Sequence, residues 1–134
     1  MLEEIERYTE QRADFGFETT LAGKTYLKTF KEMKATGYRL NLYFLWLQSP
    51  ELALRRVAER ASMGGHAVPA QTILRRFDRG LHNLFHLYRQ FLDSWLLFDN
   101  SGEVPRLIAK EALGKTTVID GALFQLILKN TEVS

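Results

Sequence analysis

Arginines suited to binding phosphate are concentrated in one part of the sequence. Seven arginines and only two acidic residues lie between residues 52 and 92, so this stretch has a formal charge of +5. Three of them, Arg75, Arg76 and Arg79, fall within one arc of about 100° on a predicted helix. Guanidinium groups this close repel one another unless an anion or acidic side chains lie among them. Because the paired N–H donors of arginine match two phosphate oxygens, the spacing predicts a phosphate-binding face.

The same arginines have an ordinary alternative, which is a solvated helix face with scattered surface partners. Gly64 and Gly65 precede the helix and favour the phosphate-binding interpretation, because a glycine pair can form a hinge. We therefore predict an arginine-bearing lid over about residues 61–80 that closes on a polyphosphate, with residues 63–68 mobile when no ligand is bound.

Two other groupings look like binding motifs. The sequence GKT at residues 23–25 matches the end of the phosphate loop G-x-x-x-x-G-K-[ST], but Glu18 stands where the first glycine belongs. A bulky acid there removes the tight turn and repels phosphate, so GKT is expected to lie at the start of an ordinary helix. His82 and His86 have the spacing of a chelating pair, but no third ligand is evident, and no metal site is predicted.

The periodicity of apolar residues predicts the elements that position these groups. Helices are expected over residues 2–12, 22–35, 50–62, from 70, over 81–95 and from about 120. Buried strands are expected over Phe15–Thr19, Leu40–Leu47 and Trp95–Phe98, with weaker extended runs at 106–109 and 116–119. Residues 40–47 are nearly all hydrophobic, which is typical of a strand covered on both faces.

Strands that alternate with helices predict one α/β domain over residues 1–134, with a mainly parallel sheet flanked by helices. The chain contains no cysteine, which excludes disulfides and thiol catalysis. The longest apolar run has six residues, against about 20 for a membrane span, and the acidic N-terminus shows no signal peptide. We therefore predict a cytoplasmic protein with no membrane partner.

Five stretches of the sequence carry a family resemblance. They are DFGFETTLAGKTY (14–26), GYRLNLYFLWLQSPELALRRVAER (37–60), GGHAVP (64–69), ILRRFDRGLHNL (73–84) and DNSG (99–102). In these motifs the chain resembles the bacterial zeta-toxin family of P-loop kinases, which includes UDP-N-acetylglucosamine kinases. The resemblance implies an adenylate-kinase-like core, ATP-dependent phosphorylation of a sugar-nucleotide hydroxyl, and a link to toxin–antitoxin systems.

The sequence departs from the family pattern at one end. In the family a first strand, a Walker A loop and a catalytic Asp precede the helix with which this sequence begins, and residues 1–134 contain none of the three. The resemblance therefore implies the C-terminal two-thirds of a kinase, and we expect a truncated reading frame or a gene remnant without turnover of its own. ATP and Mg²⁺ are implied by the resemblance only, and neither is expected to bind this chain tightly.

The resemblance also implies roles for residues near the arginine helix. Glu18, Thr19 and Thr20 would hold the substrate sugar or nucleotide through hydrogen bonds. Arg76 and Arg79 would be lid arginines that neutralise charge on the transferring phosphoryl group. Arg75 lies in the same arc, so which two of the three arginines contact phosphate stays open. Glu18 has the alternative role of capping the next helix.

Four further residues would lie around the nucleotide by the same resemblance. Arg60 would flank the base, His66 would donate to a phosphate, and Asn100 and Ser101 would line the adenine site. Each has a structural alternative, since loop histidines commonly make structural hydrogen bonds and DNSG forms a turn without any ligand.

Two other function classes compete with the kinase. The first is a non-enzymatic nucleotide or RNA binder that uses the arginine cluster, for which binding would weaken steeply with salt and show no preference for ATP. The second is an antitoxin-binding or self-associating remnant, because a sheet that lacks a strand exposes apolar surface.

Overall fold

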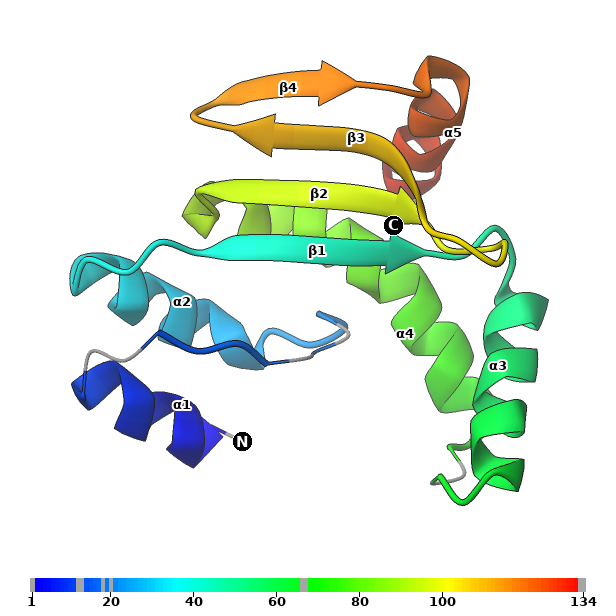
Figure 1. The fold of residues 1–134 in the computed structure, drawn as a ribbon, viewed down its shortest axis with the longest axis horizontal. Coiled ribbons are helices and arrows are strands. Elements are labelled where there is room, and N and C mark those ends of the chain that lie inside the picture. Colours follow the sequence, from blue (N-terminus) through cyan, green and yellow to red (C-terminus); the bar gives the residue numbers. More distant parts are fainter. Residues whose placement is uncertain (1, 12–13, 18, 20, 66–67, 133–134) are drawn as a thin grey trace.

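The computed structural model describes residues 2–11, 14–17, 19, 21–65 and 68–132 (Figure 1). The described α-helices are α1 (Leu2–Glu10), α2 (Thr25–Ala35), α3 (Pro50–Ser62), α4 (Ala70–Asn83) and α5 (Gly121–Glu132). The strands are β1 (Asn41–Trp46), β2 (Ser94–Asp99), β3 (Arg106–Ala112) and β4 (Lys115–Val118). A π-helical turn (Leu84–Tyr88) and a 3₁₀ turn (Arg89–Phe91) join α4 to β2. In the described part of the chain, no helix is both long enough and apolar enough to cross a membrane.

The α/β class is confirmed, but the sheet is mixed rather than mainly parallel. The strands lie in the order β1-β2-β3-β4 (Figure 1). β1 pairs with β2 in parallel, whereas β2 with β3 and β3 with β4 are antiparallel. The physical reason is the length of the connections: a short turn between β3 and β4 permits only an antiparallel hairpin, whereas the parallel pair is joined through α3 and α4.

A strand was expected at Phe15–Thr19, but residues 15–17 and 19, which the structure describes, adopt no strand. Their aromatic rings pack on helices instead. The Phe15 ring lies 5.3 Å from that of Tyr8 in α1, and the Phe17 ring lies 5.3 Å from that of Tyr26 in α2. The aromatic residues that suggested a strand therefore serve packing against helices.

The prediction that β1 is covered on both faces is also wrong. Tyr43 and Leu45 are 70% and 54% exposed, whereas Trp46 is buried and Leu42 and Phe44 pack against the core. Successive side chains of a strand point to opposite faces, so one face of β1 packs on the protein and the other is open. A continuous apolar run does not by itself show that both faces are covered.

Helix ends follow the local signals of the sequence. The Ser49 hydroxyl accepts the backbone N–H of Leu52 at 3.2 Å, with Pro50 at the first helical position of α3. At the other end of α3, Gly64 has φ +97°, its N–H donates to the Ala61 carbonyl, and the Gly65 N–H donates to the Arg60 carbonyl at 2.8 Å. This pair of bonds is a Schellman cap. Gly64 and Gly65 therefore terminate α3, and the predicted lid is not shown.

The core lies between one face of the sheet and the segments α2, α4 and α5. Its fully buried side chains include Leu84 and Tyr88 from the turn after α4, Trp95 and Leu97 from β2, and Ile108 from β3. The apolar period expected to continue as one helix to Trp95 ends at Phe91, and Trp95 belongs to β2. Leu81, Leu84, Tyr88 and Trp95 of this period are buried, and Phe85, Phe91 and Leu92 are half-buried against the core.

Candidate functional site

A pocket of about 490 Å³ lies between α4 and the segment that leads into α2. Arg75, Arg76 and Arg79 line it from α4. Residues before and at the start of α2 line the other side: Thr19, Ala22, Gly23, Thr25 and Tyr26. The structure therefore brings Thr19 together with all three arginines.

The pocket has a positive electrostatic character. Among the described residues, the ion pairs are Lys28–Glu32, Lys34–Asp93 and Arg89–Glu111, so none of the three pocket arginines is paired with an acid there. The first turn of α2 has no side-chain cap, and its residues Thr25 and Tyr26 line the same pocket. The helix dipole adds positive potential at that end. Anions are the ligands that this pocket suits.

Two polar side chains from the buried end of α4 and the turn that follows it fix the backbone on the other side of the pocket. The Asn83 side-chain amide donates to the Leu21 carbonyl at 2.6 Å, and the Tyr88 hydroxyl donates to the Gly23 carbonyl at 2.7 Å. Burial raises the pKa of Tyr88, so its hydroxyl stays protonated as a donor. Leu21 has φ +56°, a conformation uncommon for a residue with a side chain, and its N–H donates to the Thr19 hydroxyl at 3.2 Å. The segment is thus held in an unusual shape beside the arginines.

Sequence reasoning did not identify Asn83 and Tyr88 as residues that act on the site. Asn83 is 5% exposed in a helix that is otherwise apolar on that face, and a buried amide generally has a hydrogen-bonding task. The sequence contained a hint of this role, because Asn83 is a polar residue between Leu81 and Leu84, two residues of the apolar period. Its partner, a loop carbonyl 62 residues earlier, could not be read from the sequence.

The other predicted site residues fall into two groups. Glu18, Thr20 and His66 lie outside the described residues. Arg60, Asn100 and Ser101 are described, but they do not line the pocket with the arginines. Arg60 is exposed in the last turn of α3, and its carbonyl accepts the Gly65 N–H of the cap.

The loop after β2 is held by contacts within the protein. The Arg56 guanidinium donates to the carbonyls of Asn100 and Ser101, the latter at 3.2 Å. The Ser101 hydroxyl accepts the Gln48 N–H at 2.8 Å, and the Ser101 N–H donates to Asp99 at 3.0 Å. These bonds hold the DNSG turn through contacts within the protein.

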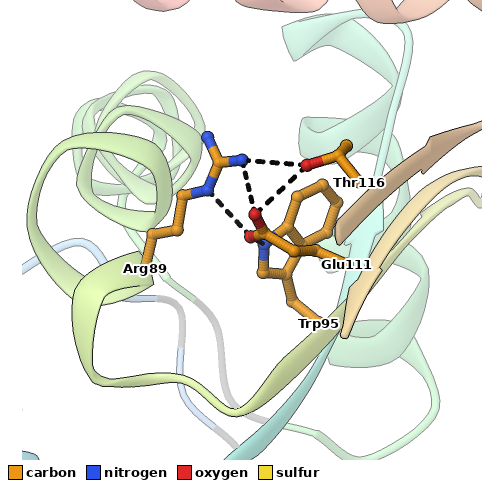
Figure 2. A network of polar contacts seen from close by, with 4 residues as sticks. All are labelled: Arg89, Trp95, Glu111 and Thr116. Atoms are coloured by element: carbon orange, nitrogen blue, oxygen red, sulfur yellow. Dashed lines mark hydrogen bonds and ion pairs between the residues drawn. The ribbon is translucent and has the colours of Figure 1, made fainter. Parts of the chain in front are cut away.

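A second polar cluster lies across β2, β3 and β4 (Figure 2). The Arg89 guanidinium donates twice to the Glu111 carboxylate, both at 2.8 Å. That carboxylate also accepts the Trp95 indole N–H and, at 3.1 Å, the Thr116 hydroxyl. The bonds from Arg89 hold the pKa of Glu111 below its ordinary value, and Glu111 in turn raises the pKa of Arg89. With its partners satisfied, this cluster stabilises the fold.

The histidine pair has a structural contact of its own. His82 Nδ1 and His86 Nε2 lie 3.0 and 3.2 Å from the carbonyl oxygen of Thr131, in the last turn of α5. The last carbonyls of a helix lack partners within it, so the imidazoles serve as a cap. Within the described ranges, no group of three or more potential metal-ligating side chains is found.

Fold and pocket together define an α/β protein with a pocket lined by three arginines. The sequence profile of the zeta toxin family matches residues 2–111, so the chain belongs to that family. The family suggests a kinase-like function. An uncharacterised protein of Haemophilus influenzae is 26% identical over 68 residues, which are 51% of this chain and 49% of that protein. The match thus spans about half of that relative's length. No solved structure matches the chain significantly.

Proposed function

We propose that this chain forms the arginine side of a kinase that transfers the γ-phosphoryl group of ATP to a hydroxyl of a sugar nucleotide such as UDP-N-acetylglucosamine. The observation that carries the proposal is the pocket in which Arg75, Arg76 and Arg79 gather without acidic partners in the described part of the chain. Negative charge on the phosphate oxygens is what such a cluster neutralises during phosphoryl transfer.

The lining residues fit phosphate and hydroxyl groups. Guanidinium groups supply paired donors to phosphate oxygens, and Thr19 and Thr25 supply hydroxyls that donate to or accept from a sugar. The named lining residues include no carboxylate, so Mg²⁺ enters this proposal only with ATP and not as an ion held by these side chains. The roles that the family resemblance implies stay part of this proposal for Glu18, Thr20, Arg60, His66, Asn100 and Ser101.

The experiment that tests the proposal compares ligands and salt. Binding of ATP, UDP-N-acetylglucosamine and a short single-stranded RNA is measured by calorimetry at two salt concentrations. The proposal expects the nucleotides to bind more tightly than the RNA per phosphate group, with a moderate salt effect. Equal binding of all three with a steep salt dependence would instead favour the non-enzymatic binder.

A further inference from the structure

Two histidines, one in α4 and one in the turn after it, approach the same carbonyl oxygen of α5. His82 Nδ1 lies 3.0 Å and His86 Nε2 lies 3.2 Å from the carbonyl oxygen of Thr131. The centroids of the two imidazole rings are 4.4 Å apart. The spacing of the histidines in the sequence offered no third ligand, and the fold supplies one from the backbone, 45 residues after His86.

These three atoms are donors that suit a divalent transition-metal ion. Imidazole nitrogen is a good ligand for Zn²⁺, Ni²⁺ and Cu²⁺, whereas Mg²⁺ prefers oxygen ligands. Ligands bound at about 2.0–2.1 Å around a tetrahedral Zn²⁺ lie about 3.3–3.4 Å from one another. The nitrogen–oxygen distances of 3.0 and 3.2 Å differ from this spacing by only a few tenths of an ångström. The two rings and the carbonyl are therefore already gathered as a set of ligands would be.

The carbonyl is fixed, and one of the two rings is open to solvent. Thr131 is buried, and its hydroxyl donates to the Leu128 carbonyl at 2.8 Å, which holds this end of α5 in place. His82 is half-buried, whereas His86 is exposed. An ion and its water ligands can therefore reach the three atoms from the side of His86.

We propose that His82, His86 and the Thr131 carbonyl form a binding site for Zn²⁺ or a chemically similar divalent transition-metal ion. To bind the ion, each neutral ring carries its proton on its other nitrogen, Nε2 of His82 and Nδ1 of His86, so that a lone pair faces the site. Water completes the coordination.

The bound ion connects two parts of the chain. It ties α5, which follows the family-matched residues 2–111, to the helix that carries the three pocket arginines. Neither histidine lines the arginine pocket, so the site does not depend on the proposed kinase function. Its role is to clamp α5 onto α4.

Calorimetry with ZnCl₂ tests the site on the full chain, without a polyhistidine tag and without nucleotide. We expect one Zn²⁺ per chain, bound more tightly than Mg²⁺. His82→Gln and His86→Gln should each weaken Zn²⁺ binding by about tenfold or more, since even the loss of an outer-shell partner costs about that much. A glutamine amide can still donate to the Thr131 carbonyl, so the cap is kept while the metal ligand is removed.

The composition of the chain supplies the matched control. The sequence has three histidines and no cysteine, so His66→Gln removes the remaining imidazole and should bind Zn²⁺ like wild type. Thermal melting gives a second measurement. Zn²⁺ should raise the melting temperature of wild type and of His66→Gln but not of the other two variants, because an ion that binds only the folded chain stabilises it.

If His82→Gln or His86→Gln fails to fold, nuclear magnetic resonance of the His66→Gln chain replaces them. The imidazole nitrogen signals that remain in this chain belong to the proposed ligands, and Zn²⁺ should shift both. Zn²⁺ bound no more tightly than Mg²⁺, or one Zn²⁺ per two chains, would overturn the proposal. So would binding that His66→Gln loses, unchanged binding in either His82→Gln or His86→Gln, or imidazole signals that do not shift.

Discussion

Arg75, Arg76 and Arg79 differ from most surface arginines in having neighbours that are also cationic. All three are exposed, line one pocket with Thr19 and the start of α2, and form no ion pair with a described acid. Their mutual repulsion is relieved when an anion binds. Residues of this kind therefore contribute to ligand binding more than to folding.

We expect Arg76→Ala and Arg79→Ala each to weaken ATP binding by about three- to tenfold, which is the range for an ordinary hydrogen bond, because these side chains are exposed and their charge is screened by solvent. Calorimetry gives the dissociation constants, and thermal melting should show little change in stability. Arg55→Ala is the matched control, because Arg55 is exposed on α3 and does not line the pocket. An equal loss in the Arg55 variant would show that only general charge matters.

Tyr88→Phe tests whether the turn after α4 positions the pocket. The substitution removes only the hydroxyl that donates to the Gly23 carbonyl, so we expect a loss of about 1 kcal/mol in the free energy of unfolding. ATP binding should weaken two- to fivefold as well, although Tyr88 is not among the residues that line the pocket. Destabilisation without any change in affinity would mean that the bond only supports the core.

At the scale of elements, helices were predictable because their signals are local. Ser49 and Pro50 predict the start of a helix, and α3 begins there. Gly37 predicts the end of a helix, and α2 ends just before it. The shared face of Arg75, Arg76 and Arg79 was predictable for the same reason, because all three lie on one helix and their spacing in the sequence determines their directions. The opposite wall of the pocket could not be predicted, because it depends on contacts between distant segments, such as that of Asn83 with Leu21. No local sequence pattern encodes such contacts.

Strands were harder to predict, because a strand depends on its partner. Extended segments were expected at Trp95–Phe98, 106–109 and 116–119, and strands β2, β3 and β4 lie there. Their antiparallel pairing was not expected. Residues 14–17 had the composition of a strand and pack their rings on helices instead. Backbone pairing is a property of two segments, so composition alone does not determine it.

Alanine substitutions test the cap at the end of α3. A Cβ at position 65 would lie 2.8 Å from the Arg60 carbonyl oxygen, and Gly64 has φ +97°. We expect Gly64→Ala and Gly65→Ala each to lower the free energy of unfolding by about 1 kcal/mol or more. Chemical denaturation measures this loss. Gly102→Ala, where a Cβ meets no atom within 4 Å, should be neutral, and an equal loss there would contradict the account.

For the whole molecule, two carboxylates connect stability to pH. Hydrogen bonds from Lys34 and Arg89 lower the pKa values of Asp93 and Glu111 respectively in the folded state. A folded pKa below the unfolded one adds stability above the unfolded pKa, and this stability is lost as the pH falls through the folded value. We expect the melting temperature to fall on acidification below the ordinary carboxylate range, and the decline to shrink in Glu111→Gln and Asp93→Asn. An unchanged decline in both variants would contradict this assignment.

Catalysis by residues 1–134 alone is expected to be undetectable. Phosphoryl transfer depends on a phosphate-binding loop and its lysine, and these residues contain no complete G-x-x-x-x-G-K-[ST] sequence. Removing one electrostatic donor commonly lowers the rate about a hundredfold or more, so the absence of several should abolish turnover. A radiolabelled ATP assay with UDP-N-acetylglucosamine measures this, and phosphorylation above the no-enzyme rate would refute the prediction.

Hydrogen–deuterium exchange with and without ATP tests most directly whether the arginine pocket is the nucleotide site. The account predicts that ATP slows exchange in residues 19–26 and in α4 together, and that the double variant Arg76→Ala/Arg79→Ala loses both effects. Protection confined to the loop at residues 99–102, or protection of residues 19–26 that persists in the double variant, would contradict it.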